Sequence, residues 1–457
     1  MRKKAAGQIP RQHSRAINTT KTIALAFAGI ILLGTLLLAL PIASRDGHSC
    51  GFLPALFIAT SATCVTGLSL FDTWTQWSGF GQTVILCLIE IGGLGFMSVA
   101  SLVVFLLRRK VGLKQRMVMA QALSLTDIHG VVRLQKLVLL GSISIQGVGA
   151  LILTLRFAQS YEFWTALKWG VFHSVSAFCN AGFDIFGSIS PGGSLIAFCS
   201  DPVLLMTLSV LIVIGGLGFF VWQEIITQHR WGKFSVYTKL VLLMTGGLIL
   251  GGWILVCLLE WNNPGTLGNM SIADKLVNGL FQSVTTRTAG FASIDQAALT
   301  DAGKAVSMVL MLIGGSSGST AGGVKTVTMM VLLLFLTARS RGKSAVCAFK
   351  RTIPGSQVMD AMTICTIMTG LAVFGTIFIT ATSPMNFADA AFESVSALAT
   401  VGLSAGGTAC LSIPSQILII IYMYFGRVGV LTISLGFLMG DRAEERFEYA
   451  KTNLLIG

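Results

Sequence analysis

The chain has 457 residues, of which 53% are apolar and only 11% are charged. Soluble domains usually carry about 25% charged residues, so this composition excludes an ordinary soluble protein. The net charge is +13, but the basic residues gather in short blocks between apolar stretches, which excludes nucleic acid as the partner and indicates membrane orientation instead.

The positions of the basic residues predict the topology. Of the 32 lysines and arginines, 24 lie in five blocks, which we expect on the cytoplasmic side because cytoplasmic loops are enriched in these residues. The blocks cover residues 2–21, 108–136, 230–239, 339–351 and 442–451. This distribution predicts a multi-pass membrane protein with both termini in the cytoplasm, and membrane lipid as a partner because anionic lipid attracts such blocks.

The first apolar element begins near residue 21. It is predicted to be a retained transmembrane helix, because it is longer than the roughly 7–15-residue core of a signal peptide. A short, half-polar stretch then ends at Gly67, and a second apolar span continues to residue 108. Both ends of this unit are expected in the cytoplasm, and the short stretch is too short to cross the bilayer. It must therefore dip in from outside and leave on the same side.

The same unit recurs three more times. Each short stretch begins with phenylalanine, is rich in serine and threonine, and ends with a glycine; the four glycines are Gly67, Gly182, Gly290 and Gly402. The predicted repeats cover residues 21–108, 132–228, 238–338 (with a broken second helix) and 357–440, between a cytoplasmic N-terminus (1–20) and a cytoplasmic tail (441–457). The predicted fold is an all-α polytopic membrane protein with four helix–pore-loop–helix repeats in a pseudo-fourfold arrangement, giving eight transmembrane helices and four re-entrant pore helices.

The four short stretches are the candidate functional site. Irregular backbone at membrane depth costs several kcal/mol per unsatisfied polar group, so it persists only where it is buried in protein or lines a wet cavity. Around one axis, such backbones can replace the water shell of a cation, as in potassium-channel filters. The predicted selectivity filter, with backbone carbonyls as ligands, comprises Val65, Thr66, Gly67, Leu68, Asn180, Ala181, Gly182, Phe183, Thr288, Ala289, Gly290, Phe291, Thr400, Val401, Gly402 and Leu403. The plainer alternative is four turn glycines in tight helical hairpins.

A second motif lies in the returning spans, where Ile91-Gly-Gly-Leu-Gly-Phe96 recurs unchanged at residues 214–219. In the third unit, five glycines between residues 314 and 323 must break the helix at about 1 kcal/mol each. At the equivalent register the fourth unit carries an arginine. The predicted gate below the filter comprises Gly314, Gly315, Ser316, Ser317, Gly318, Ser319, Thr320, Gly322, Gly323 and Arg427. The alternative is tight helix packing through small residues, with the arginine reaching the inner interface.

Other polar residues at membrane depth are weaker candidates. Glu90 is a candidate counter-ion of the gate arginine or of Lys325. Arg287 either points away from the axis to pair with a carboxylate or shapes the pore mouth, and the structural role is favoured. His173 and Glu393 occupy the same place in two pore helices, where capping or packing is expected.

These features resemble the Trk/Ktr/HKT superfamily of potassium transporters from about residue 20 to about residue 440. Eight spans and a short N-terminus resemble the KtrB-type membrane subunits of bacterial Ktr systems. The resemblance implies potassium uptake across the cytoplasmic (inner) membrane of a bacterium by a homodimer, under control of a cytoplasmic KtrA-like nucleotide-binding ring. It implies K⁺ as the transported ion, Na⁺ as a coupling or activating ion, and no covalent cofactor. Gly67 favours potassium, because a serine at this position accompanies sodium permeability in some plant relatives.

Two other functions remain open from the sequence. A secondary carrier could bind another small solute at the broken helix, although parallel fourfold repetition argues against it. Gly315-Ser-Ser-Gly318 also fits the Gly-x-Ser-Gly pattern of rhomboid-type intramembrane serine proteases. A serine nucleophile needs a base, however, and of the histidines only His173 lies in membrane-depth sequence. We therefore expect a transporter and no enzyme.

Overall fold

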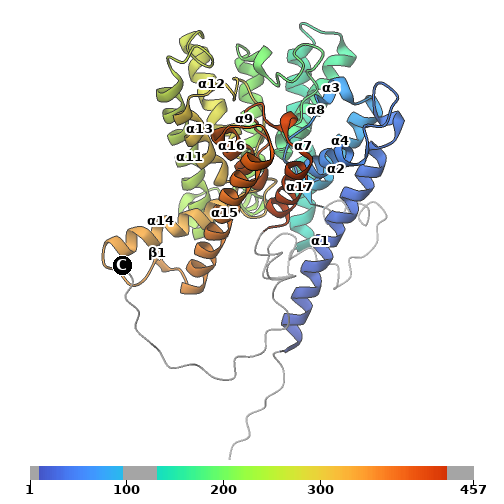
Figure 1. Cartoon of the computed structure of the whole chain (residues 1–457). Helices are drawn as coiled ribbons and strands as arrows, with labels where there is room; N and C mark the ends of the chain where they lie inside the picture. The colour runs from blue at the N-terminus through green and yellow to red at the C-terminus, as the bar shows by residue number, and fades with distance from the viewer. Residues whose placement is uncertain (1–9, 96–130, 430–457) are drawn as a thin grey trace, which may run out of the picture.

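The computed structural model describes residues 10–95 and 131–429 of the chain. The assignments made above for residues 1–9, for the end of the first repeat and for residues 430–457 lie outside the described residues. Figure 1 shows a bundle of helices, with the long helix α1 along one side and α14 extending sideways on the other.

The described elements follow the predicted units in chain order. The first unit holds α1 (Pro10–Leu38), α2 (Phe52–Thr63), α3 (Thr73–Gln76) and α4 (Gly79–Leu94). The second holds α7 (Val131–Phe157), α8 (Phe163–Cys179), α9 (Pro202–Leu217) and α10 (Phe219–Gln228). The third holds α11 (Val236–Glu260), α12 (Ile272–Thr285), α13 (Asp301–Leu312) and α14 (Thr326–Ser340), followed by a hairpin of β1 (Cys347–Ala348) and β2 (Arg351–Thr352). The fourth holds α15 (Gly355–Thr382), α16 (Phe387–Leu398) and α17 (Ile413–Val428).

The long helices have the length and composition of membrane spans. Within the described ranges, three are long and apolar enough to cross a bilayer: Leu134–Phe157 of α7, and the whole of α11 and α15. The bent pair α9 and α10 passes the same test together, and α2, α4 and α17 are among the shorter apolar helices. The architecture is that of an all-α polytopic membrane protein, while the number of eight spans stays a prediction.

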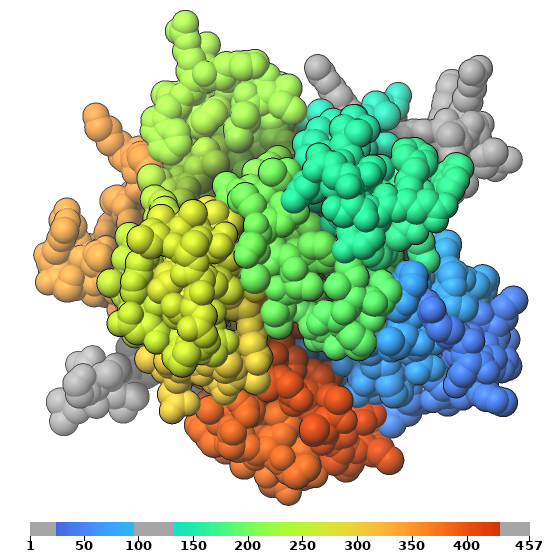
Figure 2. Space-filling view, turned by 90° about the horizontal axis from the view of Figure 1, so that it is seen from above, coloured from blue at the N-terminus to red at the C-terminus, as the bar shows by residue number. Residues whose placement is uncertain are grey.

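The short helices α2, α8, α12 and α16 form a closed ring. Each packs against the long helix that begins its own unit, namely α1, α7, α11 or α15. Each also contacts the returning helix of the preceding unit: α4 meets α8, α9 meets α12, α13 meets α16, and α17 meets α2. The units therefore follow one another around a centre in chain order, as the colours in Figure 2 show.

One phenylalanine in each unit holds its short helix in this ring. Phe57, Phe281 and Phe392 are 0% exposed and Phe172 is 3% exposed. Since lipid tails are as apolar as these rings, the gain comes from close packing against neighbouring helices rather than from removal from water. The first position of the sequence motif is thus a packing position.

The returning helices begin at polar N-caps. In each, the side-chain oxygen of the cap accepts a hydrogen bond from the backbone N–H three residues later, a contact that typically contributes about 1 kcal/mol. The cap pairs are Ser78 with Gly81 (3.3 Å), Asp201 with Leu204 (3.1 Å), Thr300 with Gly303 (3.0 Å) and Ser412 with Ser415 (3.4 Å). The same start signal therefore repeats in all four units.

The returning helices of three units end at a glycine with a positive φ. These are Gly95 (φ 81°), Gly218 (φ 91°) and Gly429 (φ 94°). In the second unit the structure differs from the long straight span expected from the sequence, because α10 leaves Gly218 at 94° to α9. Only glycine adopts such backbone angles readily, so the last glycine of the Ile-Gly-Gly-Leu-Gly motif sets this corner.

Candidate functional site

Each short helix ends in the same backbone turn. The residue two positions before each glycine is left-handed, although left-handed backbone costs a non-glycine residue about 1–2 kcal/mol. These residues are Val65 (φ 57°), Asn180 (φ 59°), Thr288 (φ 66°) and Thr400 (φ 52°), and the glycines that follow them have φ of 97°, 69°, 82° and 93°. A strained turn that recurs four times indicates a shared functional requirement on the backbone.

The four glycines meet at the centre of the ring. A methyl group added to any one of them would collide with the backbone of the next unit, so no side chain fits at these positions. The contacts of the added carbon are Gly67 with the oxygen of Ala181 (2.5 Å), Gly182 with that of Ala289 (2.7 Å), Gly290 with that of Val401 (2.6 Å), and Gly402 with that of Thr66. The last contact closes the ring between the fourth unit and the first.

The other predicted filter residues are buried, and three of them, Leu68, Phe183 and Leu403, line the space on one side of the glycine ring. All twelve non-glycine members are at most 2% exposed, and they pack among the surrounding helices. At the ring itself, the four glycines place backbone against the backbone of the next unit. Backbone carbonyls in such a position can replace the hydration water of a cation. The described residues contain no group of three or more His, Cys, Asp or Glu side chains arranged for a metal ion.

A hydroxyl group on each short helix braces the turn that follows it. The Ser61 and Ser396 hydroxyls accept hydrogen bonds from the amides of Gly67 and Gly402, both at 3.1 Å. The hydroxyls of Ser176 and Thr285 instead donate to the carbonyl oxygens that follow the other two glycines; the acceptors are Phe183 (2.7 Å) and Phe291 (2.7 Å). The serine and threonine content of the motif thus has a structural role that sequence reasoning did not assign.

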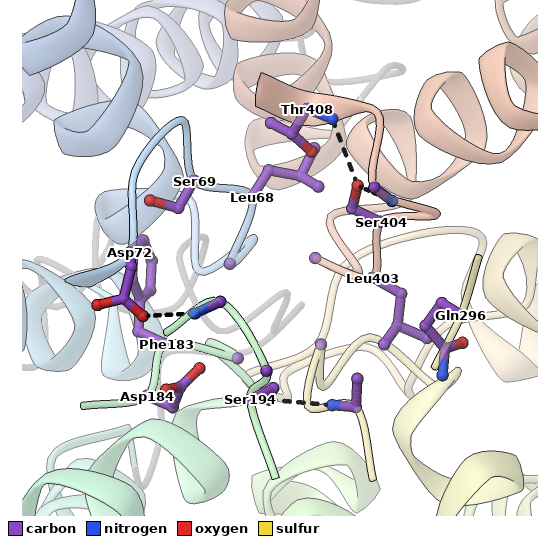
Figure 3. A pocket seen from close by; sticks show the side chains of 18 of the residues that line it. Leu68, Ser69, Asp72, Phe183, Asp184, Ser194, Gln296, Leu403, Ser404 and Thr408 are labelled. Carbon is purple, nitrogen blue, oxygen red and sulfur yellow. Dashed lines mark hydrogen bonds between the residues drawn. The ribbon is translucent and has the colours of Figure 1, made fainter. Parts of the chain in front are cut away.

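A cavity opens above the glycine ring, on the side of the loops that follow the glycines (Figure 3). Its volume is about 350 Å³, and all four glycines line it. Three carboxylates also line it, those of Asp72, Asp184 and Asp295. Negative charge at the mouth of a pore raises the local concentration of cations.

Two of these carboxylates hold the loop of the second unit. The Asp72 carboxylate accepts a hydrogen bond from the amide of Gly192 at 3.0 Å, which ties the first unit to the second. The Asp184 carboxylate accepts one from the amide of Phe186 at 3.2 Å. Burial, together with the nearby Asp72 charge, raises the pKa of Asp184 to about 6, although the bonds it accepts act in the opposite direction.

In three units, the side chain that directly follows the motif phenylalanine forms hydrogen bonds with the loop beyond the glycine. These residues are His173, Gln282 and Glu393. His173 Nε2 accepts from the amide of Ile185 at 3.4 Å, and Glu393 accepts from the Thr408 hydroxyl at 3.0 Å. In the third unit, Gln282 exchanges two hydrogen bonds with Gln296, at 2.7 and 3.0 Å. His173 and Glu393 thus make packing contacts of the kind expected, whereas Gln282 was missed although it occupies the same place in the motif.

The predicted gate loop lies directly below the glycine ring. Ile313 and Val324 pair as a short parallel bridge, so residues 314–323 form a closed loop between them. The Thr320 hydroxyl donates to the oxygen of Phe178 at 3.2 Å, near the end of α8. On the other side, a carbon added to Gly322 would collide with the side chain of Thr400, so the loop lies close to the fourth predicted filter segment.

The loop is also fastened to the second returning helix at its corner. The amide of Ser316 donates to the oxygen of Gly216 at 3.0 Å, and the amide of Phe219 donates to the oxygen of Gly318 at 2.9 Å. The Tyr237 hydroxyl, from α11, donates to the oxygen of Ser317 at 2.9 Å. The bend at the end of α9 therefore creates the surface on which the loop rests.

Three cationic side chains, the buried Arg287 and the half-buried Lys325 and Arg427, bind carbonyl oxygens of this loop. Arg427 donates to the oxygen of Thr320, and also to the last turn of α4 at Gly93, at 3.0 Å, and at Gly92. The other two contacts are Lys325 Nζ with the oxygen of Ala321 (2.8 Å) and Arg287 Nη2 with that of Gly314 (3.4 Å). The carbonyl-rich C-terminus of α4 is a favourable place for the arginine charge.

The structure corrects two expectations about buried charges. Glu90 is not the counter-ion of Arg427 or of Lys325; its carboxylate accepts hydrogen bonds from Gln146 Nε2 (2.9 Å) and Cys179 Sγ (3.3 Å) instead. Arg287 points to Thr245 and Gly314 rather than to a carboxylate, in the structural position that was favoured. Backbone oxygens take the place of the carboxylates that the sequence suggested, and backbone partners carry no residue signature.

The protease alternative finds no catalytic pair. In the Gly-x-Ser-Gly pattern of residues 315–318 the nucleophile would be Ser317. His173 donates through Nδ1 to the oxygen of Trp169 at 2.7 Å, and its other nitrogen faces Ile185. The serine therefore lacks the base that a nucleophile needs.

Comparisons with known proteins identify the family and agree with the fold. Residues 3–445 match the family of TrkH, described as a cation transport protein. The chain is 39% identical to the potassium/sodium uptake protein NtpJ of Enterococcus hirae over 97% of this chain and 98% of that one. It is also 39% identical to the Ktr system potassium uptake protein B of Bacillus subtilis, over 93% and 94%. The crystal structure of the potassium transporter TrkH from Vibrio parahaemolyticus superposes with a TM-score of 0.67 at 17% identity, covering 90% of this chain and 84% of that one.

Proposed function

Because the chain belongs to the TrkH family of cation transport proteins, we propose that it takes up potassium ions through the centre of the glycine ring. Family membership makes it a membrane transporter of the potassium/sodium uptake class rather than an enzyme. The observation that carries the proposal is the closed ring of four glycine backbones beneath a cavity that all four line.

In this proposal the backbone carbonyl oxygens of the sixteen filter residues replace the water around the ion. The four repeated turns and the close approach of the four glycine backbones support this role. The C-terminal ends of the short helices carry partial negative charge, which favours a cation at the ring. Because the residues beside the glycines differ between units, we expect fewer well-formed ion sites than in a fourfold-symmetric channel.

The proposed gate is the loop 314–323 together with Arg427. The loop lies beneath the ring, and its carbonyls are held by Arg427 and Lys325. A positive charge just below a cation filter also raises a barrier to the ion. Opening therefore requires the loop to release these contacts and move aside.

The relatives support the remaining parts of the proposal. Sodium stands in the name of the Enterococcus hirae relative, which supports Na⁺ as a coupling or activating ion. The Bacillus subtilis relative is named as protein B of a Ktr system, which supports a partner subunit. The proposed assembly is the one that the family resemblance implies, a homodimer regulated by a KtrA-like cytoplasmic nucleotide-binding ring. The basic blocks support placement in the inner membrane of a bacterium with both termini in the cytoplasm.

Rubidium uptake by a potassium-uptake-deficient bacterial strain tests the filter. Expression of the chain should restore uptake, and Gly290→Ser should reduce the preference for potassium over sodium by roughly tenfold, since a side chain in left-handed backbone costs about 1–2 kcal/mol and meets the oxygen of Val401. Gly246→Ser is the matched control, because no atom lies within 4 Å of the added carbon there. Restored uptake with an unchanged ion preference in Gly290→Ser would refute the filter.

Arg427→Ala tests the gate in the same strain. Loss of the contacts to Thr320 and Gly93 should free the loop and remove the barrier, raising the initial rate of rubidium uptake by roughly tenfold if the charge contributes about 1.4 kcal/mol. Arg156→Ala is the control, because Arg156 pairs with Asp201 in the loop region away from the gate. An uptake rate equal to that of the parent would show that Arg427 has no part in gating.

A further inference from the structure

Two basic segments that are far apart in the sequence meet at the N-terminal end of α11, opposite the end that leads to α12. One segment follows α10 and the other connects α14 to α15. Lys239 Nζ, in the first turn of α11, lies 5.4 Å from the ring centre of Phe349 at the tip of the hairpin. Helices α10 and α14 both contact α11, and α14 contacts β1. The fold thus joins the two segments into one surface.

This surface carries exposed positive charge. We define it as the basic surface by six exposed residues: Arg230, Lys233, Arg339, Arg341, Lys350 and Arg351. No aspartate or glutamate occurs between residues 326 and 359. The ion pairs among the described residues, Arg156–Asp201 and Lys304–Asp389, involve none of the six. Within residues 10–95 and 131–429, these positive charges are therefore available to an anionic partner.

The tip of the hairpin holds two of these features in a strained turn. Phe349 (φ 46°) and Lys350 (φ 64°) are both left-handed, at positions of a two-residue hairpin turn where asparagine and glycine are usual. Left-handed backbone costs each of them about 1–2 kcal/mol. The strained turn therefore places the aromatic ring of Phe349 beside the basic side chain of Lys350. Strained backbone of this kind is concentrated at functional sites such as ligand-binding sites.

Apolar side chains border the basic surface. Ile226 (54%), Trp231 (48%), Leu336 (61%) and Phe349 (44%) are exposed on the same elements. In Figure 1, α14 runs across the direction of α11 and α15, as a helix does when it lies along a membrane surface. Aromatic and basic residues together are typical of the boundary between the hydrocarbon and the headgroups.

We propose that the basic surface binds the phosphate headgroups of anionic phospholipids in the cytoplasmic leaflet, with Trp231 and Phe349 inserted at the level of the headgroups. The inference rests on the proposed orientation of the basic loops and goes beyond the transport function. Charge complementarity with an anionic headgroup and the exposed apolar side chains that border the surface both favour a lipid occupant.

Titration of fluorescent phosphatidylglycerol into the full-length protein in phosphatidylcholine nanodiscs tests the proposal. Each basic residue near an anionic membrane surface contributes roughly fivefold in affinity, so the double variant Lys350→Gln/Arg351→Gln should bind phosphatidylglycerol roughly 25-fold more weakly. The loss should shrink at high salt, because screening weakens the parent. Phe349→Ala should weaken binding in a manner that salt does not change.

The matched control removes two positive charges from the opposite face. Arg45 and Lys168 both lie over the ring of Trp74, at 4.6 and 5.0 Å, so the control is Arg45→Gln/Lys168→Gln. Equal losses in the two double variants would mean that net charge alone attracts the lipid, and would overturn the proposal. Parent-like lipid binding by Lys350→Gln/Arg351→Gln would also overturn the proposal. If this variant in addition failed to retain a co-expressed cytoplasmic subunit, the basic surface would be a protein-docking face instead. Rubidium uptake by the variants in the test strain should stay at the parent level whichever lipid-binding result is obtained. The transport proposal is therefore tested separately from the lipid proposal.

Discussion

At the scale of single residues, Asp184 connects the cavity to proton concentration. Its carboxylate lines the cavity above the glycine ring, and burial raises its pKa to about 6. The carboxylate is therefore charged above about pH 6 and neutral below it. A unit charge about 4 Å away contributes about 1 kcal/mol even in water, so its loss lowers the local cation concentration by roughly fivefold. We expect rubidium uptake at subsaturating concentration to fall by about this factor as external pH falls from 7.5 to 5.

The variant Asp184→Asn isolates this titration. It should lose the decrease between pH 7.5 and pH 5 and should transport at pH 7.5 as the parent does at pH 5. A folded pKa above the ordinary value of 3.8 also means that the native state holds this proton more tightly than the unfolded state. The contribution of Asp184 to stability is therefore full below about pH 4 and is lost as the pH rises through about 6. A pH profile of Asp184→Asn that matches the parent would contradict this role.

The same scale shows what the sequence could and could not predict. The filter glycines could be placed by their shared upstream motif, because four equal turns need four equal sequences. The partners of Arg427 could not be predicted, because they are backbone oxygens of Thr320 and Gly93. Glu90 was the natural sequence candidate for that charge, but it faces Gln146. A carbonyl oxygen is present at every residue, so no residue type indicates which one is used.

At the scale of elements, the glycines of the returning helices are contact points with the short helices. A carbon added to Gly215 in α9 would collide with the backbone oxygen of Phe178 at the end of α8. The adjacent Gly216 has only a side-chain nitrogen of Asn180 near that position, at 3.7 Å. Overpacking typically costs about 1–3 kcal/mol, so Gly215→Ala should lower the thermal unfolding temperature of the purified protein.

Gly216→Ala is the matched control in the same helix turn. Because alanine favours helix over glycine by about 1 kcal/mol and finds room there, this variant should be neutral or slightly more stable. If both variants unfolded at the same temperature as the parent, α9 and α8 would not be in the close contact described.

Elements were predicted unevenly, for a physical reason. The four short helices and the break in the third returning span follow from local signals, namely a repeated motif and five glycines in ten residues. The corner at Gly218 was missed because the first-unit and second-unit motifs are identical and apolar, and an apolar stretch containing glycine is compatible with a straight span. At this corner the amide of Phe219 donates to the oxygen of Gly318 in the loop of the third unit, and the loop amide of Ser316 donates to the oxygen of Gly216. These partners lie about 100 residues apart in the sequence, so no local pattern indicates them.

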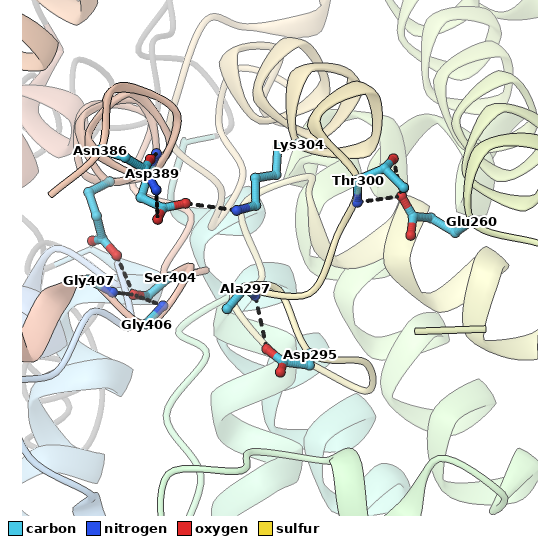
Figure 4. A network of polar contacts seen from close by, with 11 residues as sticks. Glu260, Asp295, Ala297, Thr300, Lys304, Asn386, Asp389, Ser404, Gly406 and Gly407 are labelled. Carbon is cyan, nitrogen blue, oxygen red and sulfur yellow. Dashed lines mark hydrogen bonds and ion pairs between the residues drawn. The ribbon is translucent and has the colours of Figure 1, made fainter. Parts of the chain in front are cut away.

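At the scale of the whole molecule, the ring is held by contacts between successive units as well as within them. The third and fourth units are joined by an ion pair, Lys304 Nζ of α13 with Asp389 of α16, at 2.8 Å (Figure 4). Their side chains are only 10% and 22% exposed. The sequence predicted the order of the units around the axis but not this pair, since 85 residues separate its members.

Removal of one member of this pair should loosen the ring. Lys304→Met leaves the Asp389 carboxylate partly buried with only Asn386 beside it, at 2.7 Å, and loss of one partner of a buried pair costs about 3–5 kcal/mol. Because Asp389 retains some contact with solvent, we expect a loss near 3 kcal/mol, measured as a lower unfolding temperature in detergent. The double variant Lys304→Met/Asp389→Leu removes both charges and should recover most of it, since an apolar pair of similar volume often replaces a buried ion pair without loss. If the double variant were as unstable as the sum of the two single variants, the contact between α13 and α16 would depend on something other than this ion pair.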